Sequence, residues 1–352
     1  MTLAKARVGI SLPYTGGSRG TADLVYDYWY AGASIAFVAE AYSLDAVSQL
    51  GFITARVPNV EIATNILPIY TRTPSLLAMT AAGLDELSRG RFTLGLGASG
   101  PQVVEGFHGI RYDAPLARTR EVVEICRAVW RRERVDHHGT HYDIPLTRER
   151  GGSGLGKPLK LINSPFREQI PVFVASMGPK NVELTAEIAE GWAPFFFPPE
   201  SARDVWGASL DAGLAKRDPA LGPLDTMVPV DLAVGDDVEH LLEAMRPTLA
   251  LYIGGMGAKG ANFYNELATR AGYGAAAAEI QDHYLAGRKE AAEAAVPIEL
   301  ARAISLIGER GYVRERVAAF REAGVTTFIA NPVSPEPKHR LKSISALADL
   351  LA

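Results

Sequence analysis

The chain has 352 residues, of which 47% are hydrophobic, and its formal net charge is −4. This composition allows a large buried core in one α/β domain or in two smaller ones. The sequence has no basic stripe typical of nucleic-acid binding and no apolar run long enough to cross a membrane, so we expect a cytoplasmic protein without either partner.

Short apolar runs alternate with helical patterns along the first half of the chain, as in βαβ units. The helix that follows Thr73 is the best marked, because Thr73 suits the N-cap, Pro74 suits the first helical position and Gly90 suits the position after the end. The other predicted elements here are strands at 7–12, 35–39, 60–68 and 91–97, a helix capped near Thr21, and helices at 45–56 and 118–132.

The same alternation continues through the second half, interrupted by predicted insertions at about 133–168 and 254–300. Its predicted elements are strands at 170–176, 192–197, 227–234 and 325–331, and helices that end at Gly191, begin at Ser201, run through Leu251 and close the chain from Arg340. Eight alternations in one chain predict a (β/α)8 TIM barrel, with residues 1–352 as a single domain.

Gly95, Gly97 and Gly100 form a G-x-G-x-x-G pattern after the fourth predicted strand. A dinucleotide fingerprint belongs in the first βα turn of an open sheet, whereas here Pro101 and a predicted loop follow, so we do not expect a Rossmann site. At the carboxyl end of a barrel strand, glycine instead lets a flat ligand approach the backbone.

The segment 176–181, with the sequence SMGPKN, follows the fifth predicted strand. Ser176 or Gly178 can cap the next helix and Pro179 suits its first turn, so free backbone N–H groups at the barrel mouth would attract an anion. Lys180 and the Ser176 hydroxyl would add to this site. The alternative is an ordinary helix cap.

Two other patterns do not predict chemistry. His137, His138 and His141 lie in an insertion without the ligand spacing of a known zinc site, so we expect no metal there. Cys126 is the single cysteine and lies on the apolar face of a predicted helix, which indicates a buried and unreactive thiol.

Residues 65–109 and 174–192 resemble the bacterial luciferase-like monooxygenase family and, within it, the oxidoreductases that use coenzyme F420, a deazaflavin. The resemblance extends from about Val8 to Gly191 and returns at 324–332. It implies a flavin-type ring at the barrel mouth, backed by a bulge with a non-proline cis peptide between Thr64 and Ile66. Without the resemblance, Asn65 would be read as an ordinary strand end.

The resemblance also implies a set of cofactor contacts at three strand ends, in which the fifth strand end holds the cofactor phosphate. These contacts are Thr64, Asn65, Ile66, Gly97, Ala98, Ser99, Ser176, Met177, Gly178 and Lys180.

The sequence departs from the family pattern beside the ring. Several F420-dependent members carry an acid and a histidine after the second strand; Glu40 fits the acid, but Ala41 replaces the histidine. Gly100 stands where relatives that oxidise sugar phosphates have a glutamate, so we do not expect that activity. Glu40, Tyr42 and Asn65 stay candidates for proton handling or ring hydrogen bonds, with a structural role for Glu40 as the alternative.

Aromatic residues at two predicted strand ends, Tyr14, Phe195 and Phe197, suggest a substrate pocket that the second insertion covers. We therefore expect an F420-dependent oxidoreductase that acts on a small organic substrate, and the resemblance implies that a homodimer is an option. An FMNH2-dependent monooxygenase and a catalytically silent cofactor-binding protein are the alternatives.

Overall fold

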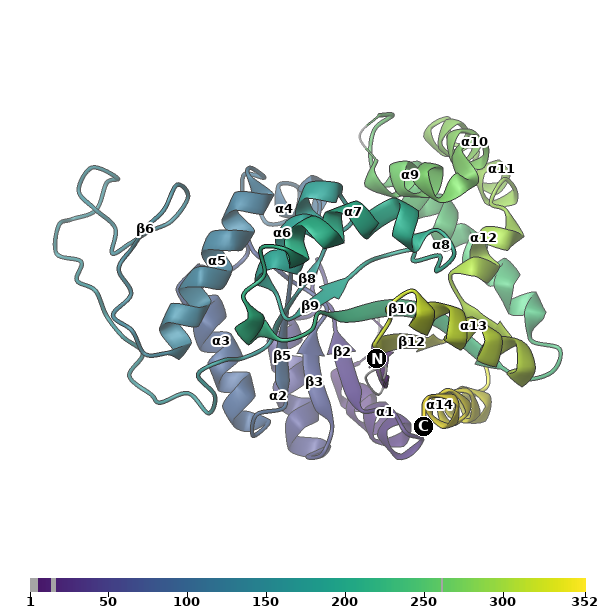
Figure 1. The fold of residues 1–352 in the computed structure, drawn as a ribbon, viewed down its shortest axis with the longest axis horizontal. Helices are drawn as coiled ribbons and strands as arrows, with labels where there is room; N and C mark the ends of the chain where they lie inside the picture. Colours follow the sequence, from purple (N-terminus) through teal and green to yellow (C-terminus); the bar gives the residue numbers. More distant parts are fainter. Residues whose placement is uncertain (1–5, 14–16, 261) are drawn as a thin grey trace.

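A closed parallel barrel forms the centre of the molecule in the computed structural model, which describes residues 6–13, 17–260 and 262–352, without the side chain of Ser18 (Figure 1). Within these residues the barrel strands are β1 (Arg7–Ser11), β2 (Ile35–Val38), β3 (Glu61–Thr64), β5 (Phe92–Gly97), β8 (Val172–Ala175), β9 (Gly191–Ala193), β10 (Asp225–Val234) and β12 (Thr327–Pro332). The barrel closes because β12 pairs with both β1 and β10, and β10 also pairs with β9. The predicted TIM barrel is confirmed.

Helices surround the barrel, and their ends follow local sequence signals. The Thr73 hydroxyl accepts a hydrogen bond from the Leu76 amide (3.2 Å), and the Asp45 carboxylate accepts one from the Ser48 amide (2.7 Å). The surrounding helices are α1 (Ser18–Tyr30), α2 (Ala46–Arg56), α3 (Pro74–Leu87), α5 (Pro115–Trp130), α6 (Pro179–Ile188), α7 (Ala202–Leu214), α13 (Arg310–Glu322) and α14 (Pro337–Leu351).

Each barrel strand alternates between two cores. On β10, Val228, Val230 and Leu232 face the helices and belong to the main core, whereas Met227 belongs to a small cluster inside the barrel. The other buried members of this inner cluster are Ile35, Phe37, Ala63, Phe173, Ala193 and Ile329. This alternation fixes which residues face the barrel axis.

The insertion at 133–168 extends beyond α5 (Figure 1) and contains a hairpin of β6 (His137–His138) and β7 (Asp143–Ile144). Glu121 of α5 holds the hairpin, because its carboxylate accepts hydrogen bonds from the His141 and Tyr142 amides (3.1 and 2.9 Å) and contacts His137 Nε2 (3.2 Å). His138 lies between two aspartates of the hairpin. The described residues contain no cluster of three or more side chains that could hold a metal ion.

The second insertion is helical, as predicted. Residues 254–300 contain α9 (Phe263–Ala268), the π-helix η4 (Thr269–Tyr273), α10 (Gly274–Leu285), α11 (Lys289–Ala294) and the start of α12 (Ile298–Ala303). The single helix predicted through Leu251 is instead the 3-10 helix η2 (Glu239–Met245) and α8 (Arg246–Ala250), followed by the π-helix η3 (Leu251–Gly255), which leads into the insertion. The sequence analysis missed β11 (Leu306–Gly308), which pairs with the end of β10, and α13 after it. A three-residue strand after an alanine-rich run carries too little periodicity to be recognised.

Several predicted boundaries are wrong. A short helix, α4 (Pro101–Val104), follows the glycine run where a loop was expected, and α1 begins at Ser18 rather than near Thr21. α6 ends at Ile188, so Gly191 begins β9 instead of ending the helix. The remaining short elements are β4 (Leu67–Pro68) and the 3-10 helix η1 (Pro219–Leu221).

Two expectations from composition can be compared with the structure. Cys126 is buried, as predicted, and burial raises the pKa of its thiol to about 12. No helix in the described part of the chain is long and apolar enough to span a membrane.

Candidate active site

Small side chains line the barrel where its strands end. By the alternation described above, the last inward-facing positions of β1, β5 and β8 are Ser11, Gly97 and Ala175, and Ala39 continues the inward row of β2. Side chains of this size leave the backbone accessible, which suits a flat ligand.

The bulge after β3 is present, and its Asn65–Ile66 peptide bond is cis, as predicted. The Asn65 amide donates to the Val38 carbonyl (2.7 Å), and the Ile66 carbonyl accepts from the Glu40 amide (3.2 Å). Ile66 packs with Ala175 on the inner cluster, so these two side chains cover the barrel core at its carboxyl end.

Gly95 is required by this bulge rather than by a ligand. The Thr64 hydroxyl donates to the Gly95 carbonyl (2.9 Å) and accepts from the Gly95 amide (2.8 Å). A Cβ atom at Gly95 would lie 1.9 Å from the Thr64 carbonyl oxygen and 2.3 Å from the Phe173 ring. The Thr64 side chain is fully buried in this contact, which corrects its prediction as a cofactor contact.

The segment from Gly97 to Ser99 continues from β5 at the mouth of the barrel. Ala98 and Ser99 are half-buried, and Ser99 has a positive φ of 58°. The Ser99 carbonyl accepts a hydrogen bond from the Tyr112 hydroxyl (3.4 Å). A Cβ atom at Gly97 would lie 2.9 Å from the Ile66 side chain, so Gly97 and the bulge form adjacent parts of one surface.

The N-terminus of α6 is also open at this end. Gly178 is its N-cap and supplies no side-chain cap, and no described atom lies within 4 Å of a Cβ added there. Lys180 is exposed in the first turn. Pro179 has no N–H and the Asn181 amide donates to the Gly178 carbonyl (3.0 Å), so the amides left for water or an anionic ligand are those of Met177, Gly178 and Lys180.

Ser176 does not take the role expected of it. Its side chain is buried, and its hydroxyl lies 2.8 Å from that of Thr185, which in turn donates to the Asn181 carbonyl (2.7 Å). This hydroxyl therefore contributes to packing between β8 and α6, which corrects its prediction as a cofactor contact.

Arg270 of η4 is a cation at this site that the sequence analysis missed. Its guanidinium donates to the Met177 carbonyl (3.4 Å) and the Val205 carbonyl (3.3 Å). It comes from the second insertion, 93 residues after Met177, so sequence proximity gave no signal.

Glu40 takes part in a network of ion pairs and hydrogen bonds at the start of α2. Its carboxylate forms an ion pair with Arg72, in which both side chains are largely buried, and accepts a hydrogen bond from the Ala46 amide (3.0 Å) at the start of α2. Arg72 also pairs with Asp45 (2.7 Å). Because both carboxylate oxygens of Glu40 already have partners, the structural alternative is favoured.

An aromatic cluster borders the mouth on the side of the second insertion. Phe195 contacts Tyr252 (ring centroids 4.9 Å apart) and Tyr264 (5.6 Å), and these two tyrosines contact each other (4.7 Å). Burial raises the pKa of Tyr252, and nearby Tyr42 raises it further. The exposed Tyr42 ring lies 6.1 Å from the ring of Phe107.

The other predicted substrate contacts have different outcomes. Phe197 is 2% exposed and stacks on Trp206 in the main core (5.5 Å), so its prediction as a substrate contact is corrected. β9 ends at Ala193, and Phe196 has a positive φ of 50°, so the chain turns before Phe197. Tyr14 lies outside the described residues.

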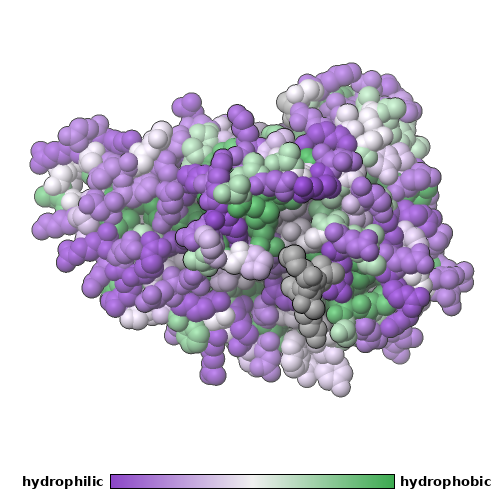
Figure 2. All heavy atoms as spheres, in the orientation of Figure 1, coloured by the Kyte–Doolittle hydropathy of each residue, from purple (hydrophilic) through white to green (hydrophobic). Residues whose placement is uncertain are grey.

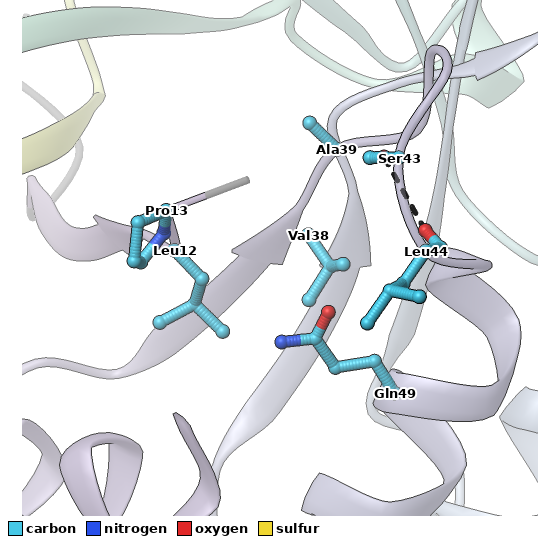
Figure 3. Close-up of a pocket in the computed structure, with 7 residues that line it drawn as sticks. All are labelled: Leu12, Pro13, Val38, Ala39, Ser43, Leu44 and Gln49. Carbon is cyan, nitrogen blue, oxygen red and sulfur yellow. Dashed lines mark hydrogen bonds between the residues drawn. The ribbon is translucent and has the colours of Figure 1, made fainter. Parts of the chain in front are cut away.

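A small pocket lies beside the mouth between β1, β2 and α2 (Figure 3). In this view Ala39 and Ser43 lie at the top, Leu12 and Pro13 at the left, and the Gln49 amide points toward the pocket from α2. The face shown in Figure 2 is mostly hydrophilic, with hydrophobic residues near its middle.

Comparison with known proteins agrees with this architecture. The family model described as luciferase-like monooxygenase matches residues 6–327. A Mycobacterium tuberculosis protein, whose name proposes it as a coenzyme F420-dependent oxidoreductase, is 39% identical over 98% of this chain and 99% of its own. The chain therefore belongs to the luciferase-like monooxygenase family.

Two solved structures share the fold. The coenzyme F420-dependent tetrahydromethanopterin reductase from Methanopyrus kandleri superposes with a TM-score of 0.80 at 19% identity, covering 98% of both chains. The oxygenating constituent of 3,6-diketocamphane monooxygenase from Pseudomonas putida, in complex with FMN, gives a TM-score of 0.67 at 18% identity, covering 99% of this chain and 98% of the other. Both proteins have the fold described here.

Proposed function

We propose that this protein is an oxidoreductase that transfers a hydride between coenzyme F420 and a small organic substrate. The observation that carries the proposal is the barrel mouth, where the Asn65–Ile66 bulge and Gly97 border one small-residue surface and the uncapped α6 N-terminus lies at the same end. The 39% identity with the M. tuberculosis relative supports F420 in particular.

The residues present fit such a cofactor. Ile66, Gly97 and Ala98 would support a flat ring, and the amides of Met177 and Gly178, with Lys180 and Arg270, would hold its phosphate. When bound, the deazaflavin supplies a hydride from carbon and reacts poorly with oxygen, because carbon replaces the flavin nitrogen. The protein contributes position and electrostatics.

The aromatic cluster indicates the kind of substrate. Phe195, Tyr252 and Tyr264 contact one another by ring faces and edges beside the mouth. Aromatic side chains bind apolar and conjugated molecules through large contact areas. We therefore propose a conjugated carbonyl compound, such as an enone or quinone, as the class of substrate.

Anaerobic turnover tests this function. Reduced F420 is supplied with a panel of enones and quinones, and its reoxidation is followed by absorbance. We expect reoxidation that depends on both the enzyme and the acceptor without oxygen. Reoxidation that requires oxygen, or activity only with reduced FMN, would favour the monooxygenase alternative. Tight F420 binding without turnover would favour the silent binding protein.

We also propose that the protein forms a homodimer in the cytoplasm. Phe52 of α2 and Leu76, Met79 and Leu87 of α3 are exposed, and α2 packs beside α3, so these side chains lie on adjoining helices. Exposed apolar surface of this kind favours association. Light scattering during gel filtration measures the mass in solution, and cell fractionation tests the location.

A further inference from the structure

Asp231 of β10 and Asn331 of β12 form a polar pair at the carboxyl end of the barrel. The two residues are register partners, and Asn331 Nδ2 donates to Asp231 Oδ1 at 2.7 Å. Neither residue belongs to a motif in the sequence, because both lie in runs that predict barrel strands.

Both side chains face the barrel axis. Met227 on β10 and Ile329 on β12 belong to the inner cluster, and alternation places Asp231 and Asn331 on the same face, closer to the mouth. Their outward-facing neighbours Val230 and Ala330 belong to the main core, which fixes this assignment. Asn331 is exposed, so the pair is reached from the mouth.

Asp231 lacks a cation, unlike Glu40. No ion pair involves it in the part of the chain that the structure describes, where Asn331 is its hydrogen-bond partner. Burial raises the pKa of Asp231, and the hydrogen bond from Asn331 lowers it by less. His339 of α14 is engaged elsewhere, because its ring contacts the Val234 carbonyl (3.1 Å), and the other aspartate on this face of β10, Asp225, pairs with Arg7 at the opposite end of the barrel.

We infer that Asp231, oriented by Asn331, is the proton donor to the substrate. This inference rests on the proposed hydride transfer. Reduction of a conjugated carbonyl adds one hydride and one proton: two electrons arrive with the hydride in the new C–H bond, and reduced F420 is oxidised by the same two electrons. The Asp231 O–H bond breaks as its proton moves to the substrate oxygen or α-carbon. Water then returns a proton to the carboxylate.

The first test compares Asp231→Asn with a matched control, Asp236→Asn, which changes an exposed carboxylate in the loop after β10. The full-length variants are assayed anaerobically with reduced F420 and 2-cyclohexenone. We expect Asp231→Asn to lower kcat by about 100-fold or more, the range for loss of a general acid, with F420 affinity within twofold of wild type. Asp236→Asn is expected to match wild type.

The second test uses Asn331→Leu, which keeps the side-chain size but removes the hydrogen bond to the carboxylate. Because that bond favours the ionised form, its loss raises the pKa of Asp231. The loss of kcat with rising pH is then expected to move to higher pH. If the pair has only a structural role, the pH at which kcat falls would be the same in Asn331→Leu as in wild type.

A third readout does not depend on turnover. In infrared difference spectra of the ligand-free protein, a protonated-carboxyl band that Asp231→Asn removes is expected to persist above the ordinary aspartate pKa of about 3.9. Absence of that band, or normal kcat in a folded Asp231→Asn variant, overturns the inference while leaving the proposed function intact. Failure of wild type to reduce any acceptor overturns both.

Discussion

Two aspartates on the same face of β10 have opposite surroundings at the two ends of the barrel. At the amino end, Asp225 pairs with Arg7 (2.5 Å) and accepts hydrogen bonds from Thr326 (2.5 Å) and Thr327 (3.0 Å). At the carboxyl end, Asp231 has only the neutral Asn331 among the described residues. A carboxylate neutralised by a cation stabilises the fold, whereas one without a cation is available for proton transfer.

The presence of a cavity does not by itself mark the active-site end of the barrel. A hollow of about 470 Å³ opens at the amino end, lined in part by Arg7, Glu61 and Asp225. These charges satisfy each other, since Arg7 bridges both carboxylates. The carboxyl end instead combines small side chains, uncapped amides and a carboxyl group without a counter-ion, which agrees with the position of active sites in TIM barrels.

The largest expected effect on stability comes from a substitution at Gly95, inside the barrel between its two ends. Gly95→Ala would place a methyl group 1.9 Å from the Thr64 carbonyl oxygen, and neither backbone can move freely within the barrel. We expect a loss of about 3 kcal/mol in the free energy of unfolding, measured by urea denaturation. Gly83→Ala is the control, because a Cβ there meets no described atom within 4 Å. Equal stability of the two variants would contradict this packing.

A substitution at the amino end of the barrel should change the stability of the fold but not the affinity for F420. Arg7→Met removes the cation between Glu61 and Asp225, which leaves two carboxylates without it. We expect unfolding to become easier by about 1–2 kcal/mol, because the three side chains are only partly buried. The dissociation constant for F420 should stay unchanged; a large increase in it would show that the amino end also contributes to binding.

A substitution at the carboxyl end of the barrel should mainly change the affinity for F420. Gly97→Val introduces atoms beside Ile66 and above Ala175, where flexible side chains can yield, so we expect a stability loss of only about 1 kcal/mol. The added side chain would occupy the surface proposed for the ring and weaken F420 binding by about tenfold or more, which is about 1.4 kcal/mol. Fluorescence titration measures this, and unchanged affinity would remove Gly97 from the proposed site.

A smaller effect is expected at the α6 N-terminus. Gly178→Val meets open space, so the fold should tolerate it, but the side chain would obstruct an anion approaching the free amides. We expect F420 affinity to fall by about five- to tenfold. Thermal denaturation provides the stability control. Inorganic phosphate should protect wild type from denaturation more than the variant, and equal protection would argue against an anion site.

Hydrophobic periodicity predicted most of the barrel, and the resemblance to the family predicted the bulge at its mouth. Strands such as 91–97 and the helix after Thr73 have strong local signals, and the family motif at Asn65 correctly indicated a cis peptide. Side-chain partners were not predictable, because they depend on tertiary packing: Ser176 turns toward Thr185. Asp231 did carry a usable signal, an acidic residue near the carboxyl end of an apolar strand.

The second insertion contributes to both proposed ligand contacts. Arg270 of the insertion lies beside Met177, and Tyr264 of the insertion contacts Phe195 together with Tyr252 of η3, whereas the bulge, Gly97 and α6 belong to the barrel itself. For enzyme engineering, we expect that an insertion with different aromatic residues would change the range of acceptors. The barrel would keep most of the residues proposed to bind the cofactor. The replacement insertion would have to keep a cation at position 270, because loss of this cation is expected to weaken cofactor binding.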